Sequence, residues 1–294
     1  MAPSYCVTPE IDTVKNIVLK TEIEQDVERA LREDLGPGDL TAALIPAERI
    51  CTARVVSREP AVLCGRPWFE AVFRRLDPAV EIRWEAEDGD RVKPGQELCR
   101  LRGPARPLLS GERTALNFLQ TLSGTATQAR RYHEAVKDLP VTVLDTRKTL
   151  PGLRRAQKYA VRCGGCSNHR MGLYDGILIK ENHILACGSI AAAVAAARRL
   201  HPTMPVEVEV ENLEEMEEAV QAGADILLLD NFGPQALERA VSLNGGRCRL
   251  EASGGITLEN IRAIALTGVD RISVGSLTKD IRAVDLSMRI DFDR

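Results

Sequence analysis

Charged and polar residues recur directly after apolar, strand-like segments in the second half of the chain. The segments VTVL, GILI and ILLL lead into the residues Asp145, Thr146, Arg147, Lys148, Lys180 and Asp230. Glu209 and Glu211 close the segment VEVEVE. In a parallel α/β barrel the carboxyl ends of the strands converge on one open face, and reactive groups lie there. The spacing therefore predicts a single polar site built from several strand ends.

Basic residues are dense from residue 147 to residue 180. They are Arg147, Lys148, Arg154, Arg155, Lys158, Arg162, His169, Arg170 and Lys180. A guanidinium group matches a carboxylate with two parallel hydrogen bonds, so several converging cations favour a small ligand with more than one carboxylate. For Arg154, Arg155 and Lys158, on an expected helix between Pro151 and Gly164, a solvated helix face is an equally good interpretation.

Two glycine-rich segments follow the last strand-like runs. They are Ser253-Gly254-Gly255 and Val274-Gly275-Ser276. Such turns expose backbone N–H groups, and in barrels the loops after the last strands often hold a phosphate. The paired arrangement therefore predicts a ligand that carries a phosphate.

Glu209 and Asp230 are carboxylates at the ends of neighbouring strand-like segments. Carboxylates in that position can hold Mg²⁺ or sugar hydroxyls, and they stabilise the positive charge of a ribosyl ring during glycosyl transfer. The bland alternative is a pair of surface acids.

Three other motifs suggest different chemistry. Lys180 could form a Schiff base, as in a barrel aldolase. The pair Cys163 and Cys166 has CxxC spacing, but zinc needs two more ligands, so a glycine-rich turn with incidental thiols is favoured. DGDRVKPGQEL resembles half of a biotinyl or lipoyl carrier module, although Lys93 is on the wrong side of the Pro-Gly turn.

The elements that must position these residues fall into two groups. A helix with apolar positions Ile23, Val27, Ala30 and Leu31 ends at residues 36–38, and short β-type runs fill residues 50–101. A further helix opens at Ser110, with Gly124 as its expected C-terminal cap. Beyond it, six strands alternate with helices, which predicts right-handed βαβ units and an irregular, incomplete α/β barrel.

The composition limits the class of protein. The 294 residues contain 39 basic and 42 acidic residues, so a net charge of −3 offers no general field for nucleic acid. There is no apolar run of about 18 residues for a membrane span and no secretory signal pattern at the N-terminus. The eight cysteines are mostly isolated, as reduced core cysteines are. We therefore expect a cytoplasmic protein.

Long segments resemble quinolinate phosphoribosyltransferase, the carboxylating nicotinate-nucleotide pyrophosphorylase. They are LLSGERTALNFLQTLSGTAT, DTRKTLPGLR, YAVRCGGCSNHRMGLYDGILIKENHI, VEVEVEN, LLLDNF, EASGGI and SVGSLTKDIRAVDLSMRI. The resemblance implies an N-terminal α/β sandwich domain (1–124) and an α/β barrel domain (125–294), with residues from about 280 packing back on the first. It also implies a homodimer whose active site is shared, in which Arg113 reaches the neighbour's substrate.

The resemblance further implies roles for individual residues. The positions that match quinolinate-binding ones are Arg113, Thr146, Arg147, His169, Arg170 and Lys180. Those that match the phosphoribosyl pyrophosphate site are Lys148, Glu209, Asp230, Ser253, Gly254, Gly255, Val274, Gly275, Ser276 and Lys279, the last in place of a histidine of some relatives. Lys148, Glu209 and Asp230 would be catalytic, and Glu209 and Asp230 would hold Mg²⁺ directly or through water. A relative acting on nicotinate or another pyridine acid stays open as an alternative.

Overall fold

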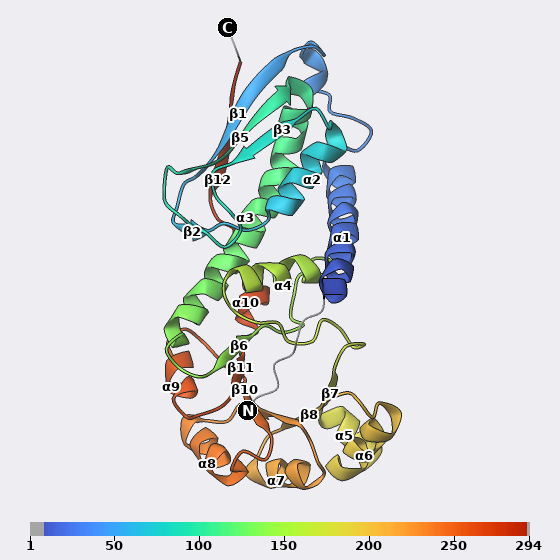
Figure 1. The fold of residues 1–294 in the computed structure, drawn as a ribbon, viewed down its shortest axis with the longest axis vertical. Coiled ribbons are helices and arrows are strands. Elements are labelled where there is room, and N and C mark those ends of the chain that lie inside the picture. Colours follow the sequence, from blue (N-terminus) through green and yellow to red (C-terminus); the bar gives the residue numbers. More distant parts are fainter. Residues whose placement is uncertain (1–8, 293–294) are drawn as a thin grey trace. The chain divides into compact units, whose positions relative to one another are not determined.

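The structure is a computed structural model that describes residues 9–292, with side chains from residue 20 onward. It comprises two compact units, drawn in Figure 1. The first contains the chain up to residue 127 together with residues 155–160 and the segment from residue 282. The second contains residues 128–154 and 161–281. Each unit has its own sheet and its own buried core.

The first unit begins with helix α1 (Pro9–Leu35), which starts before the expected helix and ends where that helix does. Ile23, Val27 and Leu31 are buried, as their helical spacing predicts. The chain then turns at Gly36, whose φ of 52° suits a residue without Cβ.

An antiparallel sheet forms the centre of the first unit, in the order β12-β1-β5-β3. The bounds are β1 (Ile50–Ser57), β3 (Glu81–Trp84), β5 (Glu97–Pro104) and β12 (Leu286–Asp291), with β2 (Ala61–Val62) and β4 (Arg91–Val92) as a separate pair. A short 3₁₀ helix, η1 (Ala42–Leu44), and helix α2 (Arg66–Leu76) complete this unit's N-terminal part. Trp68, Phe69 and Phe73 of α2 are fully buried, so this unit is the α/β sandwich that the resemblance implied.

Helix α3 runs from Ala105 to Val136. The predicted helix start at Ser110 and the predicted C-terminal cap at Gly124 are therefore both wrong. The helix continues through Gly124 without a break. A Cβ atom at this position would lie 2.2 Å from the carbonyl oxygen of Arg282, so the glycine allows a close backbone approach. Its role is packing against the chain that leads into β12, not helix termination.

The second unit is built on a parallel sheet of six strands in the order β6-β11-β10-β9-β8-β7 (Figure 1). They are β6 (Thr142–Leu144), β7 (Ile177–Ile179), β8 (Val206–Val210), β9 (Ile226–Asp230), β10 (Arg249–Ser253) and β11 (Arg271–Ser273). The edge strands β6 and β7 are not paired with each other, while Leu144 makes a parallel bridge to Ser167. The prediction of an incomplete barrel with six strands is confirmed.

Helices follow the strands of the second unit. They are α5 (Glu181–Cys187), α6 (Ile190–Leu200), α7 (Leu213–Gln221), α8 (Pro234–Asn244), α9 (Ile261–Ala265) and α10 (Ser276–Lys279). Helix α4 (Arg154–Cys163) lies between β6 and β7 in the sequence, and its residues 155–160 belong to the first unit. Val206, Val208 and Val210 belong to the apolar core with residues of α6, α7 and α8. Successive strand residues point to opposite faces, so Glu207 and Glu209 face the other way, into the barrel.

Two expectations of a general kind can be compared with the described residues. No disulfide joins two of the seven cysteines in this part of the chain, and Cys6 lies outside it. No single helix there is long and apolar enough to cross a membrane, and α5 with α6 reaches that length and composition only as a pair bent by 90°.

Candidate active site

A cavity of about 510 Å³ opens at the carboxyl ends of the parallel strands. Most of the predicted site residues line it, from six different strand ends or loops. They are Thr146, Arg147, Lys148, His169, Arg170, Lys180, Glu209, Asp230 and Ser253. The structure thus brings together residues that lie more than a hundred positions apart in the sequence.

A second cavity, of about 450 Å³, shares the lining residues Thr146, Lys148 and Ser253 with the first. Its other predicted members are Gly254, Gly255, Gly275, Ser276 and Lys279, and Gln128 and Tyr132 join them from α3. Sequence reasoning missed Gln128 and Tyr132. The hydroxyl of Tyr132 lies 3.1 Å from Ser276 Oγ, which fixes one side of the glycine-rich segment.

The two glycine-rich turns need glycine for different physical reasons. Gly254 has a φ of 91°, and a Cβ atom there would lie 2.1 Å from Asn231 Oδ1. At Gly275 a Cβ atom would lie 3.2 Å from Lys148 Cδ, within the path of the lysine side chain. Both glycines therefore leave room for polar side chains of the site.

Lys148 lies between the two cavities, and its backbone is held on both sides. Its N–H donates to Thr146 Oγ1 at 3.0 Å, and its carbonyl accepts a hydrogen bond of 2.7 Å from Thr278 Oγ1. Thr278 is fully buried. The anchored backbone lets the ammonium group serve ligands in either cavity.

Lys180 and Glu209 form an ion pair across the ends of β7 and β8. The lysine amine is engaged by a carboxylate, whereas a Schiff-base lysine must have its amine free to attack a carbonyl carbon. The geometry therefore argues against the lyase interpretation. It leaves Glu209, whose side chain is 18% exposed, close to the cavity.

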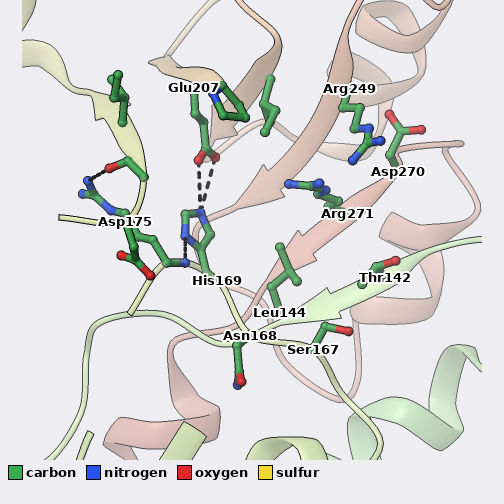
Figure 2. Close-up of a pocket in the computed structure, with 15 residues that line it drawn as sticks. Thr142, Leu144, Ser167, Asn168, His169, Asp175, Glu207, Arg249, Asp270 and Arg271 are labelled. Atoms are coloured by element: carbon green, nitrogen blue, oxygen red, sulfur yellow. Dashed lines mark hydrogen bonds and ion pairs between the residues drawn. The ribbon is translucent and has the colours of Figure 1, made fainter. Parts of the chain in front are cut away.

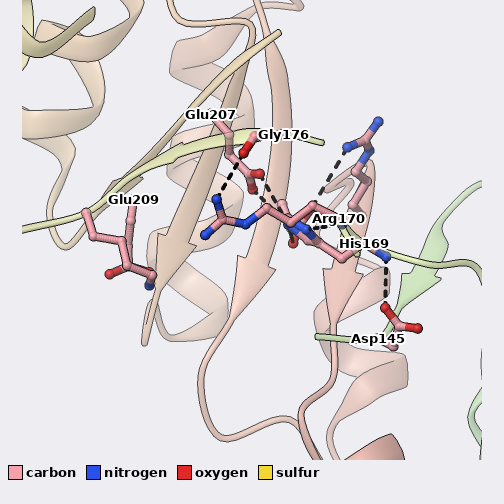
Figure 3. Close-up of polar contacts among 9 residues, drawn as sticks. Asp145, His169, Arg170, Gly176, Glu207 and Glu209 are labelled. Atoms are coloured by element: carbon pink, nitrogen blue, oxygen red, sulfur yellow. Dashed lines mark hydrogen bonds and ion pairs between the residues drawn. The ribbon is translucent and has the colours of Figure 1, made fainter. Parts of the chain in front are cut away.

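Arg147 and Arg170 place two guanidinium groups in the same cavity. Loss of solvent and, second, the charge of Arg147 lower the pKa of Arg170 from its ordinary value. Arg170 Nη1 donates to the carbonyl of Gly176 at 3.0 Å, which holds the side chain in place (Figure 3). Two neighbouring cations repel each other, and an anion bound between them relieves that repulsion.

Arg154 also lines the cavity, which the helix-face interpretation did not foresee. Its guanidinium donates to Thr149 Oγ1 at 3.1 Å and to the carbonyls of Met171 and Arg147 at 3.2 and 3.4 Å. Lys158 is fully buried, and Arg155 pairs with Glu22 at 3.0 Å. These three residues therefore do not form a solvated helix face, because each makes a distinct contact.

Two predicted residues are placed elsewhere. Val274 is fully buried in the apolar core, so only its backbone, which donates to the Leu144 carbonyl at 2.8 Å, borders the glycine-rich segment. Arg113 is exposed on α3 in the first unit and lines neither cavity. Its proposed contact with a neighbouring chain stays a prediction.

His169 borders the cavity, but both of its ring nitrogens bond within the protein. Nδ1 accepts from the Arg170 backbone N–H at 2.7 Å, and Nε2 lies 3.2 Å from Glu207 Oε2. Glu207 and the neighbouring Glu251 were missed by sequence reasoning. Their alternation with apolar residues in VEVEV and RLEAS was the available signal, because charges at inward-facing barrel positions are unusual.

Glu209 and Asp230 are carboxylates that line the cavity. Among the described residues, neither belongs to a group of three clustered His, Cys, Asp or Glu ligands. Mg²⁺ usually takes one or two protein carboxylates and completes its shell with water and substrate phosphates. Two hard oxygen donors beside a phosphate-sized cavity fit that ion.

Comparisons with known proteins agree with this geometry. The family model for the N-terminal domain of quinolinate phosphoribosyl transferase matches residues 39–123, and the model for its C-terminal domain matches residues 125–289. The probable nicotinate-nucleotide pyrophosphorylase (carboxylating) of Bacillus subtilis is 45% identical over 259 residues, which cover 88% of this chain and 90% of the relative. The carboxylating enzyme of Mycobacterium leprae is 42% identical over 272 residues, covering 89% and 95%.

Solved structures show the same fold. The nicotinate-nucleotide pyrophosphorylase from Francisella tularensis superposes with a TM-score of 0.90 at 46% identity, covering 92% of this chain and 97% of that one. Human nicotinic acid phosphoribosyltransferase, at 15% identity and a TM-score of 0.59, shares the fold alone. With both domain models matched in order along the chain, this protein belongs to the quinolinate phosphoribosyltransferase family.

Proposed function

We propose that this chain transfers a phosphoribosyl group from phosphoribosyl pyrophosphate to quinolinate and releases carbon dioxide and pyrophosphate, giving nicotinate mononucleotide for NAD biosynthesis. The observation that carries the proposal is the pairing of a cationic cavity with a glycine-rich cavity along one barrel edge. The first suits a dicarboxylate and the second a phosphate.

Arg147, Arg170 and Lys180 bind the two carboxylates of quinolinate. Each arginine can bind one carboxylate with two hydrogen bonds, and this fixes the plane of the pyridine ring. The ring nitrogen then faces the ribose. Correct placement of two reactants removes a large part of the entropic barrier of a bimolecular reaction.

The pyridine nitrogen attacks the anomeric carbon of the ribose, and the bond to the pyrophosphate oxygen breaks. Glu209 and Asp230 stabilise the positive charge that develops on the ribosyl ring and hold its hydroxyls. Lys148, anchored by Thr278, balances the charge of the departing pyrophosphate. The 5′-phosphate occupies the turns around Gly254, Gly255 and Gly275, with Ser276 and Lys279 as further donors.

Decarboxylation follows from the chemistry of the product of this first step. Alkylation turns the pyridine into a pyridinium, so the electron pair left when the 2-carboxylate departs as carbon dioxide is stabilised by the adjacent N⁺. A proton then replaces it at that carbon. The step needs no organic cofactor.

Glu209 and Asp230 would hold Mg²⁺, directly or through water, together with pyrophosphate oxygens. When bound, the ion neutralises charge on the leaving pyrophosphate. Activity lost on treatment with a chelator and restored by Mg²⁺ is the expected result. Full activity in the presence of the chelator, with no divalent ion added, would contradict this part of the proposal.

We further propose a cytoplasmic homodimer in which Arg113 of one subunit completes the quinolinate site of the other. The free thiols of the described cysteines suit a reducing compartment. Arg113 is exposed, and it is not among the residues that line the cationic cavity of its own chain. Mixing an inactive Arg113→Ala chain with an inactive Asp230→Asn chain should restore part of the activity if sites are shared.

The test of the function is a pair of reactions with phosphoribosyl pyrophosphate and Mg²⁺, one with quinolinate and one with nicotinate. We expect nicotinate mononucleotide and an equal amount of carbon dioxide from quinolinate alone. Product from nicotinate alone would replace the substrate and keep the chemistry. No product from either would overturn the proposed transfer.

A further inference from the structure

Two buried carboxylates lie inside the barrel against His169. Glu207 of β8 is 5% exposed and Glu251 of β10 is fully buried. His169 Nε2 lies 3.2 Å from Glu207 Oε2 and 3.5 Å from Glu251 Oε1, and Figure 2 shows the ring pointing toward Glu207. Neither oxygen of Glu251 has a hydrogen-bond partner among the described residues.

The hydrogen bonds of His169 determine its tautomer. Nδ1 accepts the Arg170 backbone N–H at 2.7 Å, so Nδ1 carries no proton. The single ring proton must then be on Nε2, where it is donated to Glu207. Because both nitrogens are engaged, the ring has no N–H left for a substrate carboxylate.

The same tautomer argues against a metal ion in this cluster, although the ligand atoms of His169, Glu207 and Glu251 lie within 4.8 Å of one another. A metal would need the lone pair of Nε2, and the remaining ring proton would then be on Nδ1. That proton would point at the N–H of Arg170. The hydrogen bonds of the cluster therefore suit a proton on Nε2 and not a metal ion.

Two carboxylates this close in a buried space cannot both stay ionised at low cost. Burial and, second, the charge of Glu207 raise the pKa of Glu251 to about 7, while the nearby His169 and Arg271 act in the opposite direction. Arg271 Nη1 is 4.0 Å from Glu251 Oε2. Of the two carboxylates, Glu251 therefore takes up a proton more readily than an ordinary glutamate. Glu207 is the carboxylate within hydrogen-bonding distance of His169 Nε2.

The His169 ring connects this acceptor to a residue of the cationic cavity. On one side the backbone N–H of His169 donates to Asp145 Oδ1 at 2.9 Å, and Asp145 is fully buried. On the other side Nδ1 holds the backbone of Arg170, whose guanidinium is tied to Gly176 (Figure 3). The path from Glu207 to Arg170 consists of direct hydrogen bonds.

We propose that Glu207 and His169 are positioning residues for Arg170: Glu207 fixes the ring of His169 as the Nε2–H tautomer, and the ring fixes the Arg170 backbone so that its guanidinium meets a substrate carboxylate. The raised pKa of Glu251 lessens the repulsion between the two buried carboxylates. The inference rests on the proposed role of Arg170 in binding quinolinate. It removes His169 from the set of direct ligands.

Two substitutions at one position separate positioning from direct binding. In His169→Asn the amide oxygen can replace Nδ1 as acceptor, while His169→Gln retains a group near Nε2 and loses that acceptor. We expect His169→Gln to raise KM for quinolinate about tenfold or more with a smaller change in kcat, and His169→Asn to recover most of that loss. KM for phosphoribosyl pyrophosphate should change little in both. Equal losses in the two variants would show that the ring itself binds substrate.

A double-mutant cycle tests the role of Glu207. If Glu207 acts through His169, the pair Glu207→Leu and His169→Gln should be no worse than His169→Gln alone. Fully additive losses would overturn the proposal. Glu207→Gln replaces the leucine variant if thermal unfolding shows that the latter does not fold.

Two further measurements keep the outcomes distinct. Turnover of quinolinate by the wild-type protein tests the proposed function itself. If the wild type is active and His169→Gln has an unchanged KM for quinolinate, the positioning role of His169 is contradicted and the proposed function is not. Metal analysis of the purified protein should find no stoichiometric ion that depends on Glu251. An ion lost in Glu251→Gln would overturn the assigned tautomer.

Discussion

Asn231 holds the carboxylate of Asp230 through a hydrogen bond of 2.7 Å from Nδ2 to Oδ2. Among the described residues, Asn231 is the one non-glycine residue with a positive φ, at 59°. Its backbone N–H also donates to the Ser253 carbonyl at 2.9 Å, which connects the ends of β9 and β10. Asparagine tolerates this conformation better than most residues, so the strained position serves to orient a carboxylate of the site.

Asn231→Gly should retain the backbone conformation and lose the bond to Asp230. We expect kcat/KM for phosphoribosyl pyrophosphate to fall about three- to tenfold, since one hydrogen bond to a charged group is lost, while KM for quinolinate stays within about twofold. Steady-state kinetics with each substrate varied in turn measure both values. Unchanged kinetics would mean that Asp230 needs no support from this side chain.

Arg147→Ala should raise KM for quinolinate roughly 10- to 100-fold, because it removes a cation from a partly desolvated carboxylate site. Lys180→Ala should act in the same direction and also leave Glu209 without its ion-pair partner. The matched control is Arg249→Ala, which removes an arginine that does not line the cationic cavity (Figure 2). Arg249 lines a neighbouring cavity at the amino ends of the strands, which shares His169 and Arg170 with the first. If Arg249→Ala impairs quinolinate use as strongly, a general loss of positive charge would explain the effect.

Gly124→Ala should destabilise the first unit, since its Cβ atom would lie 2.2 Å from the Arg282 carbonyl oxygen. The segment leading into β12 must move, and overpacking of this kind costs about 1–3 kcal/mol or more. Gly233→Ala is the control, because nothing lies within 4 Å of its Cβ position and we expect a change of about 0.5 kcal/mol. Thermal or denaturant unfolding compares the two. Similar stabilities would show that β12 adjusts without cost.

Glu251 should make stability depend on pH with an identifiable sign. Its pKa is about 7 in the folded state against an ordinary 4.5, so the folded state binds more protons between these values and stability falls as pH rises from about 4.5 to 7. Glu251→Gln removes this dependence. Its stability relative to wild type should therefore increase by up to about 3 kcal/mol between pH 4.5 and pH 8.

Asp138, an exposed acid whose pKa is lowered, provides the comparison for the pH dependence of stability. The hydrogen bond from Arg262 lowers the pKa of Asp138 to about 2. Its contribution is present above the ordinary pKa of 3.8 and is lost as pH falls toward 2. Asp138→Asn should thus alter stability above about pH 4 and not near pH 2. A Glu251→Gln stability curve that parallels the wild-type curve throughout would contradict the raised pKa of Glu251.

The sequence determined the order of elements and the face of the barrel that carries the site. Apolar runs of strand length alternate with helices, and parallel strands place their carboxyl ends on one edge whatever the details of packing. The positions of Arg147, Lys180, Glu209 and Asp230 in one cavity follow from that rule. Long motifs that resemble a known family supplied the expected ligand, which residue spacing by itself left open.

Only the tertiary structure decided contacts between segments distant in the sequence. Glu207 and Glu251 approach His169 because β8 and β10 curve around a shared interior, and no local pattern encodes that distance. Gly124 has the spacing of a helix cap, yet the approach of the Arg282 backbone explains it. Local periodicity reflects chain geometry, whereas the partner of a buried polar group depends on packing across the whole barrel.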